Sequence, residues 1–494
     1  MTEARRFLVR TFGCQMNEHD SERIASVLAG EGMVRTDDLQ EADVVVLNTC
    51  CIRQNADDKL YGNLGQLKSE KDRRPGLEIA VGGCLAQKDR EALLVRAPHL
   101  SAVFGTHNVA RVGALLELAR RTGEPVLEVL DAPGEDEGTD FASAMAVRHD
   151  QPYAAWVTIQ VGCNNSCAFC IVPEVRGPEV SRPFGELRAE LERLAARGTV
   201  EITLLGQNVN SYGRDLTTRW RSSTDRAAQA WAAGDRWVGE GASRSRPLFA
   251  DLLRELSAVP GIGRIRFTSP HPKDLRPETI SAMAESPAVC EQLHLPLQSG
   301  SDRILAAMRR GYTAERYLGL VAQARAAIND LAVTTDIIVG FPGETEDDFA
   351  RTLEVASEVS YDSAFTFIFS PRPGTRAAQM EELYVAPEVI ADRFERLKVV
   401  IERSALAHNR ARVGRVEEAV VEGPSKKDPR VLSGRTRQGK LVHFTPPDDN
   451  KLVPGTFVGV RIDYGAPHHL VGTLVSADER HLRNPREHIP VTSG

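Results

Sequence analysis

Between residues 153 and 412 the chain alternates apolar strand patterns with amphipathic helical patterns, and this rhythm restricts the possible fold more than any other feature. Helical patterns at 184–197, 312–328 and 345–358 separate successive strands. Strands that are connected through helices run parallel, so we expect an α/β fold with a complete or partial parallel barrel, which we take as a partial (β/α)6 barrel. The six predicted strands are 156–161, 201–205, 264–267, 292–297, 332–339 and 364–369.

Three cysteines follow the first of these strands directly. Cys163, Cys167 and Cys170 have the spacing C-x3-C-x2-C. A loop this short can direct three sulfurs to one object, but it offers no fourth ligand. A [4Fe–4S] cluster held by three cysteines keeps one iron open for a substrate or cofactor. The alternative, a zinc site completed by a distant His or Cys, usually has paired C-x2-C arms, and the sequence shows no second arm. We therefore predict an iron–sulfur cluster.

Other predicted strands of this barrel also end in polar or glycine residues. Ligand groups in a parallel barrel belong at the carboxyl ends of its strands. Each of these stretches could equally be an ordinary strand-to-helix turn. Because they share one rim with the cysteine loop, we expect them to line the pocket of the cofactor. The candidate cofactor-binding residues are Gly206, Gln207, Asn208, Gln298, Ser299 and Gly340.

The first 123 residues also alternate strands with helices and indicate an open parallel α/β domain. Cys14, Cys50 and Cys84 each lie just past the carboxyl end of a predicted strand, at 7–11, 43–49 and 77–81. In an open parallel sheet this edge is where ligands bind, so the three thiols are expected to converge. The alternative is three unrelated buried cysteines. We predict a second metal cluster.

Two further cysteines need a separate interpretation. Neighbouring side chains on an extended chain point to opposite sides, so only one of Cys50 and Cys51 is expected to reach the cluster. We choose Cys50, because it follows its strand directly. Cys290 lies at the start of a predicted strand, and we expect it to be a core residue.

Composition limits the remaining possibilities. Eight cysteines in 494 residues are too few for a disulfide scaffold, and clustered ones indicate metal binding or catalysis. No apolar run is long enough to span a bilayer, and no signal peptide is visible, so we expect a cytoplasmic protein. The net charge of −7 does not indicate a nucleic-acid binder, so such a role needs a local basic patch.

The rest of the chain divides into four parts. Residues 124–152 carry many acidic residues and are predicted to be a linker. An insertion at 214–247 is rich in Arg and Trp and contains a possible short helix at 226–233. Basic and aromatic residues suit stacking on bases, but a mobile insertion is the alternative that we favour. Residues 413–477 predict five short strands in a small barrel, and 478–494 a disordered tail.

The predicted small barrel supplies the basic patch that the whole-chain charge conceals. Residues 426–440 contain six basic residues and one acidic residue. We expect contact with RNA there, and the alternative is a solvated face of the barrel. The basic residues are Lys426, Lys427, Arg430, Arg435, Arg437 and Lys440.

Several stretches resemble the methylthiotransferase family, which belongs to the radical S-adenosylmethionine (SAM) enzymes. The similar stretches are TFGCQMN at 11–17, NTC at 48–50, VGGC at 81–84, residues 162–176, LLGQNVNSYG at 204–213, LQSGS at 297–301 and residues 336–344. The resemblance covers nearly the whole chain, and the C-terminal barrel resembles the family's TRAM domain. The insertion at 214–247 departs from the family pattern.

The resemblance implies a mechanism with two [4Fe–4S] clusters and two SAM molecules per turnover. The cluster on Cys163, Cys167 and Cys170 would generate a 5′-deoxyadenosyl radical that abstracts hydrogen from C2 of N6-isopentenyladenosine at position 37 of tRNA. The cluster on Cys14, Cys50 and Cys84 would supply the sulfur, which the second SAM methylates. An unpaired base of the anticodon loop can be turned into a pocket at low cost.

The same resemblance implies partners and leaves two rivals. The partners are tRNA, an electron donor and a sulfur donor, no membrane is expected, and we expect a monomer. One rival is methylthiolation of a ribosomal-protein aspartate by the same two clusters. The other is a non-catalytic iron–sulfur or zinc protein that binds RNA and forms no deoxyadenosine from SAM.

Overall fold

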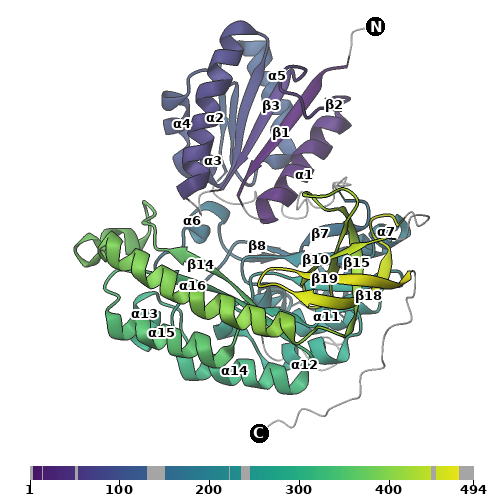
Figure 1. Ribbon diagram of the computed structural model, residues 1–494. Coiled ribbons are helices and arrows are strands. Elements are labelled where there is room, and N and C mark those ends of the chain that lie inside the picture. The colour runs from purple at the N-terminus through teal and green to yellow at the C-terminus, as the bar shows by residue number, and fades with distance from the viewer. Residues whose placement is uncertain are drawn as a thin grey trace.

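The computed structural model describes residues 4–13, 15–50, 54–130, 151–221, 223–234, 245–446 and 452–477. In these ranges an N-terminal α/β domain lies on top of a larger α/β core, and a small β-barrel lies beside the core (Figure 1). No helix in the described ranges is both long and apolar enough to cross a membrane. Cys14, Cys51, most of the acidic segment and the C-terminal tail lie outside the described residues.

The N-terminal domain is a six-stranded parallel sheet with strand order β2-β1-β3-β4-β5-β6. Its central strand explains why helices cover both faces. Val44 and Val46 face one apolar cluster, whereas Val45 and Leu47 face the other. A continuous apolar strand is therefore required here. The elements are β1 (Arg6–Phe12), α1 (Gln15–Gly30), β2 (Val34–Arg35), β3 (Val44–Thr49), α2 (Gln54–Arg73), β4 (Glu78–Gly83), α3 (Cys84–Asp89), α4 (Glu91–Arg96), β5 (Ala102–Phe104), α5 (Val112–Thr122) and β6 (Val126–Glu128).

One boundary in this domain differs from the sequence-based prediction. The linker was predicted to begin at 124, but Val126–Glu128 forms the edge strand β6, because its backbone pairs with β5. The helical segment after β4 begins directly at Cys84 and is divided into α3 and α4 at Arg90, whose φ is 44°. Cys84 is therefore the first residue of a helix.

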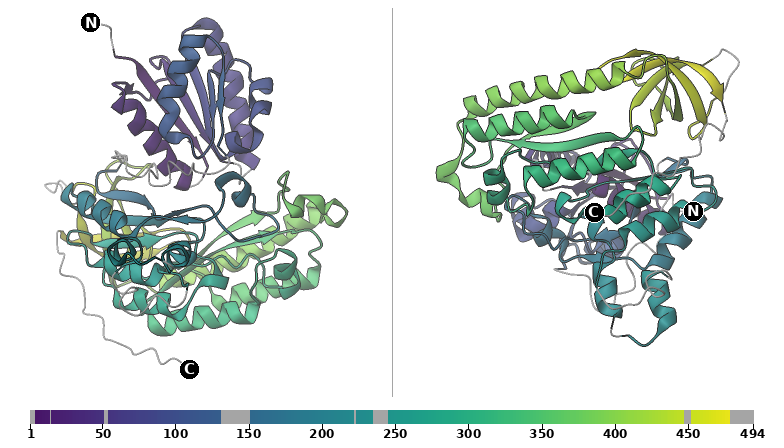
Figure 2. Two further views of the ribbon diagram at one scale, coloured as in Figure 1. Left: turned by 180° about the vertical axis from the view of Figure 1, so that it is seen from behind. Right: turned by 90° about the horizontal axis from the view of Figure 1, so that it is seen from below.

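The core contains all six predicted strands in two parallel sheets, with orders β11-β10-β7 and β12-β13-β14. A single bridge between Ile265 and Val289 connects the two sheets, so the barrel is partial. Helices cover its outer side, and the long helix α16 crosses it in front (Figures 1 and 2). The strands are β7 (Ala154–Thr158), β10 (Glu201–Leu205), β11 (Arg264–Phe267), β12 (Gln292–His294), β13 (Ala332–Val339) and β14 (Ser363–Ile368).

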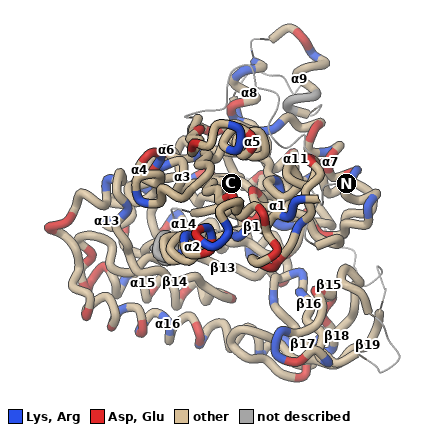
Figure 3. The backbone as a smooth tube through the Cα atoms, turned by 90° about the horizontal axis from the view of Figure 1, so that it is seen from above, with Lys and Arg blue, Asp and Glu red and all other residues tan. Residues whose placement is uncertain are grey.

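The core helices follow the predicted rhythm. The helix expected at 226–233 is confirmed as α9, and with α8 it projects from the core (Figure 3). The helices are α6 (Val172–Arg176), α7 (Phe184–Ala196), α8 (Arg214–Trp220), α9 (Arg226–Ala233), α11 (Phe249–Ser257), α12 (Pro277–Glu285), α13 (Asp302–Ala307), α14 (Ala314–Ala327), α15 (Glu346–Val359) and α16 (Pro387–Arg410). Cys290 is 2% exposed, as expected of a core residue.

The C-terminal domain is the predicted five-stranded barrel, closed in the order β15-β16-β17-β19-β18 around its own apolar core. Its side chains also pack on the α/β core, where Val420 and Phe457 contact Tyr153. The strands are β15 (Val416–Pro424), β16 (Leu432–Thr436), β17 (Leu441–Thr445), β18 (Phe457–Gly465) and β19 (Leu470–Ala477).

Candidate cluster sites and substrate cavity

The three-cysteine loop leaves the barrel between two short paired strands. β8 (Gln160–Val161) and β9 (Val180–Ser181) form an antiparallel pair, so residues 162–179 form a loop whose two ends are held together. Gly162 begins it with φ 81°, and a Cβ atom there would lie 2.0 Å from the carbonyl oxygen of Pro178. Only glycine fits this turn without a shift of the backbone.

Backbone hydrogen bonds fix the middle of the loop to the barrel rim. The N–H of Ala168 donates to the carbonyl of Met308 at 2.9 Å, and the N–H of Ala377 donates to the carbonyl of Ala168 at 2.8 Å. Phe169 packs beside Ala168 in the same apolar cluster. The loop is thus held from two sides, which orients the sulfurs of its cysteines.

The three sulfurs lie in different surroundings. Burial raises the pKa of the Cys163 thiol to about 11 and that of Cys170 to about 12. The backbone N–H of Asn165 donates to the sulfur of Cys163 at 3.4 Å. Nη1 of Arg310 donates to the sulfur of Cys167 at 3.3 Å. A bound cation such as iron would favour the thiolate form of these cysteines, because its charge offsets the cost of burial.

His271 lies on the other side of Cys167, with Nε2 4.0 Å from its sulfur. Burial, together with the charge of Arg310, lowers the pKa of His271 to about 3, so the ring is neutral. Arg310 and His271 could not be recognised from the sequence. Neither belongs to a motif, and only the fold brings them to the cysteine loop.

The donor set fits a cluster better than a single metal ion. Cys163, Cys167 and Cys170 supply three thiols on one short loop, which is the donor set of a [4Fe–4S] cluster with one open iron. Four irons spread their cysteine ligands over a larger object than one zinc ion does. The residues present therefore fit a [4Fe–4S] cluster.

Side chains beside the loop carry buried polar atoms without a partner, as a pocket for a polar cofactor would. Among the described residues, neither side-chain polar atom of Gln207 has a hydrogen-bond partner, and the same is true of Oδ1 of Asn208 and Oδ1 of Asn210. Nδ2 of Asn208 donates to Asp274 at 2.8 Å, and Nδ2 of Asn210 donates to the carbonyl of His271, which contacts the cluster loop. These atoms fit the amino, carboxylate and hydroxyl groups of SAM.

The other candidate cofactor-binding residues have different surroundings. Ser299 is fully buried and its hydroxyl bonds with Thr352 of α15, and Gly340 lies against Ile390 of α16 and donates its N–H to Glu344. Gly206 lies against Val209. Gln298 has φ 68° and bridges to Ile337 on β13. The contacts of Ser299 and Gly340 hold the rim together.

The register of the N-terminal sheet aligns the second set of cysteines. Phe12 of β1 pairs with Thr49 of β3, and Thr49 pairs with Gly83 of β4. Each of these residues comes one or two positions before a candidate cysteine. Cys50 and Cys84 are both buried at this edge, 1% and 2% exposed.

Two glycines make this edge compact. A Cβ atom on Gly13 would lie 2.3 Å from Cβ of Cys50, and one on Gly83 would lie 2.5 Å from the carbonyl of Thr49. The segment before Cys14 thus passes directly over Cys50. Cys14 itself lies outside the described residues, and so does Cys51, so the choice between Cys50 and Cys51 stays a prediction.

The segment that follows the cysteine loop of the core meets the helix that begins with Cys84 at one contact between the two domains. Helix α6, which begins two residues after Cys170, packs on α3, which begins with Cys84. Ile171 and Val175 belong to the same apolar cluster as Cys84. The hydroxyl of Thr106 donates to the carbonyl of Val175 at 2.8 Å.

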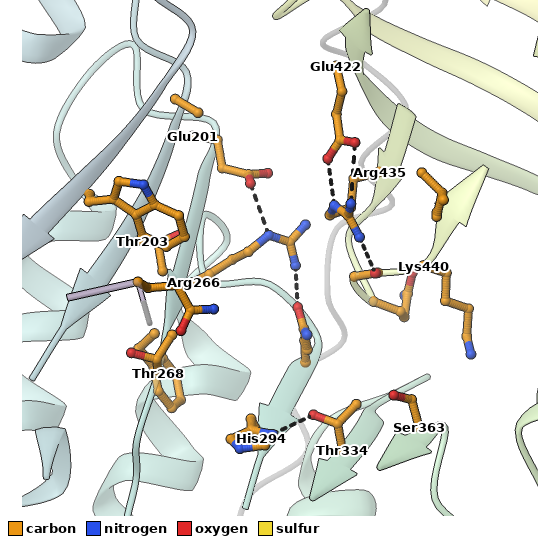
Figure 4. A pocket seen from close by; sticks show the side chains of 18 of the residues that line it. Glu201, Thr203, Arg266, Thr268, His294, Thr334, Ser363, Glu422, Arg435 and Lys440 are labelled. Atoms are coloured by element: carbon orange, nitrogen blue, oxygen red, sulfur yellow. Dashed lines mark hydrogen bonds and ion pairs between the residues drawn. The ribbon is translucent and has the colours of Figure 1, made fainter. Parts of the chain in front are cut away.

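A cavity of about 1010 Å³ opens on the inner side of the partial barrel. Its wall contains inward-facing residues of all six barrel strands, and the C-terminal barrel closes one side (Figure 4). Gln15, which directly follows Cys14, and Ser269, two residues before His271, also line it. Figure 4 shows Arg266, bonded to Glu201, facing the Arg435–Glu422 pair. Further wall residues are Trp156, Thr203, His294, Asp336, Phe365 and Phe367.

Much of the predicted basic patch has a structural role. Arg437 bonds to Glu291 at 2.6 Å, and Lys440 bonds to Asp362 at 2.8 Å while only 8% exposed. Both pairs attach the C-terminal barrel to the core. The prediction of one open basic surface is therefore wrong for these two residues, because core carboxylates neutralise them.

The remaining basic residues divide in the same way. Arg435 pairs with Glu422 of its own barrel, and Arg430, 88% exposed, pairs with Asp428. Lys426 and Lys427 are at least partly exposed on the same loop. The loop at 425–430 is therefore the part of the patch that can contact RNA.

Two family models match the chain. Residues 6–105 match a model described as uncharacterized protein family UPF0004, and residues 157–356 match the radical SAM superfamily. Together they cover most of the N-terminal domain and most of the core.

The curated relatives match over nearly the full length. A tRNA-2-methylthio-N(6)-dimethylallyladenosine synthase 1 from Mycobacterium marinum is 48% identical over 99% of this chain and 90% of its own length. Synthases from Thermobifida fusca and Streptomyces coelicolor are 48% and 49% identical over 98% and 97% of this chain, and over 92% and 89% of their own lengths.

Among solved structures, the radical S-adenosylmethionine methyltransferase TsrM from Kitasatospora setae, with cobalamin and a [4Fe-4S] cluster bound, has a similar fold. The TM-score is 0.50 with 14% sequence identity, over 78% of this chain and 80% of TsrM. At this identity the likeness concerns the fold alone.

Proposed function

Since this chain belongs to the tRNA-2-methylthio-N(6)-dimethylallyladenosine synthase family, we infer that it is a radical SAM tRNA methylthiotransferase. We propose that it adds a methylthio group to C2 of N6-isopentenyladenosine at position 37 of tRNA. The relatives reported above are all named for the tRNA reaction, whereas the ribosomal-protein alternative has no such support. The proposed substrate agrees with a cytoplasmic location.

The observation that supports the proposal most strongly is the contact between α6, which begins two residues after Cys170, and α3, which begins with Cys84. A methylthiotransferase needs a hydrogen-abstracting centre and a sulfur-supplying centre that reach the same carbon atom. When bound, one [4Fe–4S] cluster with SAM would supply a radical, and a second cluster would supply sulfur. Cys163, Cys167 and Cys170 would hold the first, and Cys14, Cys50 and Cys84 the second.

The residues of the chain would bind and orient the reactants. Gln207, Asn208 and Asn210 carry the unpartnered polar atoms that suit SAM. Because the cavity runs along the barrel strands to Gln15 and Ser269, it offers a nucleoside a path between the two centres. Ring faces of Trp156 and Phe365 in its wall suit an extruded base.

The remaining partners are also proposals. The loop at 425–430 would contact phosphates of the tRNA outside the cavity. An electron donor and a sulfur donor are required by the chemistry, and we propose that the enzyme acts as a monomer.

Two cysteine variants test the division of labour. Purified, anaerobically reconstituted enzyme is supplied with SAM, dithionite and isopentenylated tRNA, and both deoxyadenosine and methylthiolated nucleoside are measured. Cys163→Ala is expected to lose both products. Cys14→Ala and Cys84→Ala are expected to keep deoxyadenosine but lose sulfur insertion.

Two results would contradict the proposal. Methylthiolated tRNA made by Cys84→Ala would remove the sulfur-supplying role from the N-terminal site. Modification of ribosomal protein, but not of tRNA, by the unchanged enzyme would favour the alternative substrate.

A further inference from the structure

Arg310 is a buried cation without a carboxylate partner among the described residues. It lies between α13 and α14 and is 6% exposed. Its hydrogen bonds go to the sulfur of Cys167 at 3.3 Å and, from Nε, to the hydroxyl of Tyr312 at 3.3 Å. Its guanidinium also lies 5.5 Å from the centre of the Tyr312 ring. Arginine cannot release its proton, so a buried guanidinium needs a nearby negative charge.

Cys167 can supply that charge, because a cysteine that binds iron is a thiolate. Within the part of the chain that the structure describes, Cys167 is the one of the three loop cysteines with a hydrogen bond from a charged side chain. His271 adds a second N–H group. The backbone N–H of Lys273 donates to Nδ1 of His271 at 3.2 Å, which leaves the ring proton on Nε2, the atom that faces the sulfur.

We propose that Arg310, assisted by His271, raises the reduction potential of the cluster held by Cys163, Cys167 and Cys170. This inference rests on the proposed function, because it assumes a cluster at that loop. Hydrogen bonds to cysteine sulfurs are among the factors that set iron–sulfur potentials. One electron from a low-potential donor reduces the cluster from its 2+ to its 1+ state, and no bond breaks and no proton moves. The added electron strengthens the attraction between the cluster and the guanidinium, so Arg310 would stabilise the reduced state more than the oxidised state.

The neighbouring residue provides a matched control. Arg309 precedes Arg310 directly, but its side chain is exposed. Arg309→Gln and Arg310→Gln therefore remove the same charge from adjacent positions, one in solvent and one at the cluster. Arg310→Lys keeps the charge and loses the planar donor geometry.

The experiment is a redox titration of the reconstituted full-length enzyme, followed by electron paramagnetic resonance. The signal that changes when SAM is added identifies the cluster under test. Arg310→Gln is expected to make its reduction about tenfold less favourable, which is 59 mV for one electron. Arg310→Lys should recover part of this difference, and Arg309→Gln should match the unchanged enzyme.

Two results would overturn the proposal. One is a potential for Arg310→Gln equal to that of Arg309→Gln at full iron content. The other is an unchanged potential with weakened SAM binding, which would make Arg310 a ligand of SAM. If Arg310→Gln fails to retain iron, His271→Phe carries the test, with a smaller lowering expected and an unchanged potential as the contradicting result. Absence of any SAM-sensitive signal in the unchanged enzyme would instead refute the proposed function.

Discussion

A buried ion pair between Asp20 and Arg176 connects the N-terminal domain to the core. Asp20 lies on α1 and Arg176 ends α6, and their side-chain atoms are 2.8 Å apart with 4% and 5% exposure. Arg23 approaches the same carboxylate at 3.4 Å. Burial by itself would raise the pKa of Asp20, but the two guanidinium groups outweigh it and lower that pKa. The carboxylate is therefore charged at neutral pH.

Asp20→Ala would remove the carboxylate that lies between the guanidinium groups of Arg23 and Arg176. Removal of one partner of a buried pair typically costs about 3–5 kcal/mol. This cost falls on the contact between domains, and at about 1.4 kcal/mol per factor of ten it weakens that contact by at least about 100-fold. We expect methylthiolation to fall at least tenfold while deoxyadenosine formation changes only slightly, because the radical site lies within the core.

Both products can be measured in one reaction by mass spectrometry. Glu354→Ala is the control, since its pair with Arg351 is 62% and 70% exposed and is worth about 0–1 kcal/mol. Asp20→Leu combined with Arg176→Met removes both charges and should recover part of the lost activity. Equal loss of both products in Asp20→Ala, or full methylthiolation, would refute this reasoning.

Four other substitutions test local features of the structure. Lys440→Ala should lower the melting temperature, because it leaves the buried carboxylate of Asp362 without its lysine partner. Lys427→Ala should leave the melting temperature unchanged. It should weaken tRNA binding in a filter assay and reduce the salt slope of binding by about 1. Burial raises the pKa of Glu179 to about 7, so the folded protein loses stability as the pH rises from about 4.5 to 7 and this carboxyl group ionises. Glu179→Gln should therefore be about 3 kcal/mol more stable than the unchanged enzyme at pH 8 and equally stable at pH 4. Thermal unfolding at the two pH values measures this difference. Gly162→Ala should lower the iron content of the reconstituted enzyme, because its Cβ meets the Pro178 carbonyl, and a full iron content would contradict the tight turn.

The parallel sheets, and the positions of Cys50 and Cys84 just past the ends of two neighbouring strands, were predictable because both follow from local sequence pattern. The apolar run of β3 requires helices on both faces, and parallel strands bring their carboxyl ends to one edge. β6 was missed because a three-residue strand inside an acidic segment has little apolar signal, and its pairing with β5 is a tertiary contact.

The polar interior of the barrel was the main omission at the candidate site. In β11 the residues Arg264 and Arg266 alternate with apolar ones, as Gln292 and His294 do around Leu293 in β12, and this period of two indicates a second, polar face. The role of Lys440 could not be inferred in the same way. The local sequence does not distinguish a lysine that faces solvent from one that pairs with a carboxylate of another domain, as Lys440 does with Asp362.

The iron content of anaerobically reconstituted protein tests the central claim most directly. Two clusters on two cysteine triads predict about eight irons per chain, and about four for Cys84→Ala or Cys163→Ala. A content of about four in the unchanged enzyme, or one that the Cys84 substitution leaves at about eight, would contradict the account.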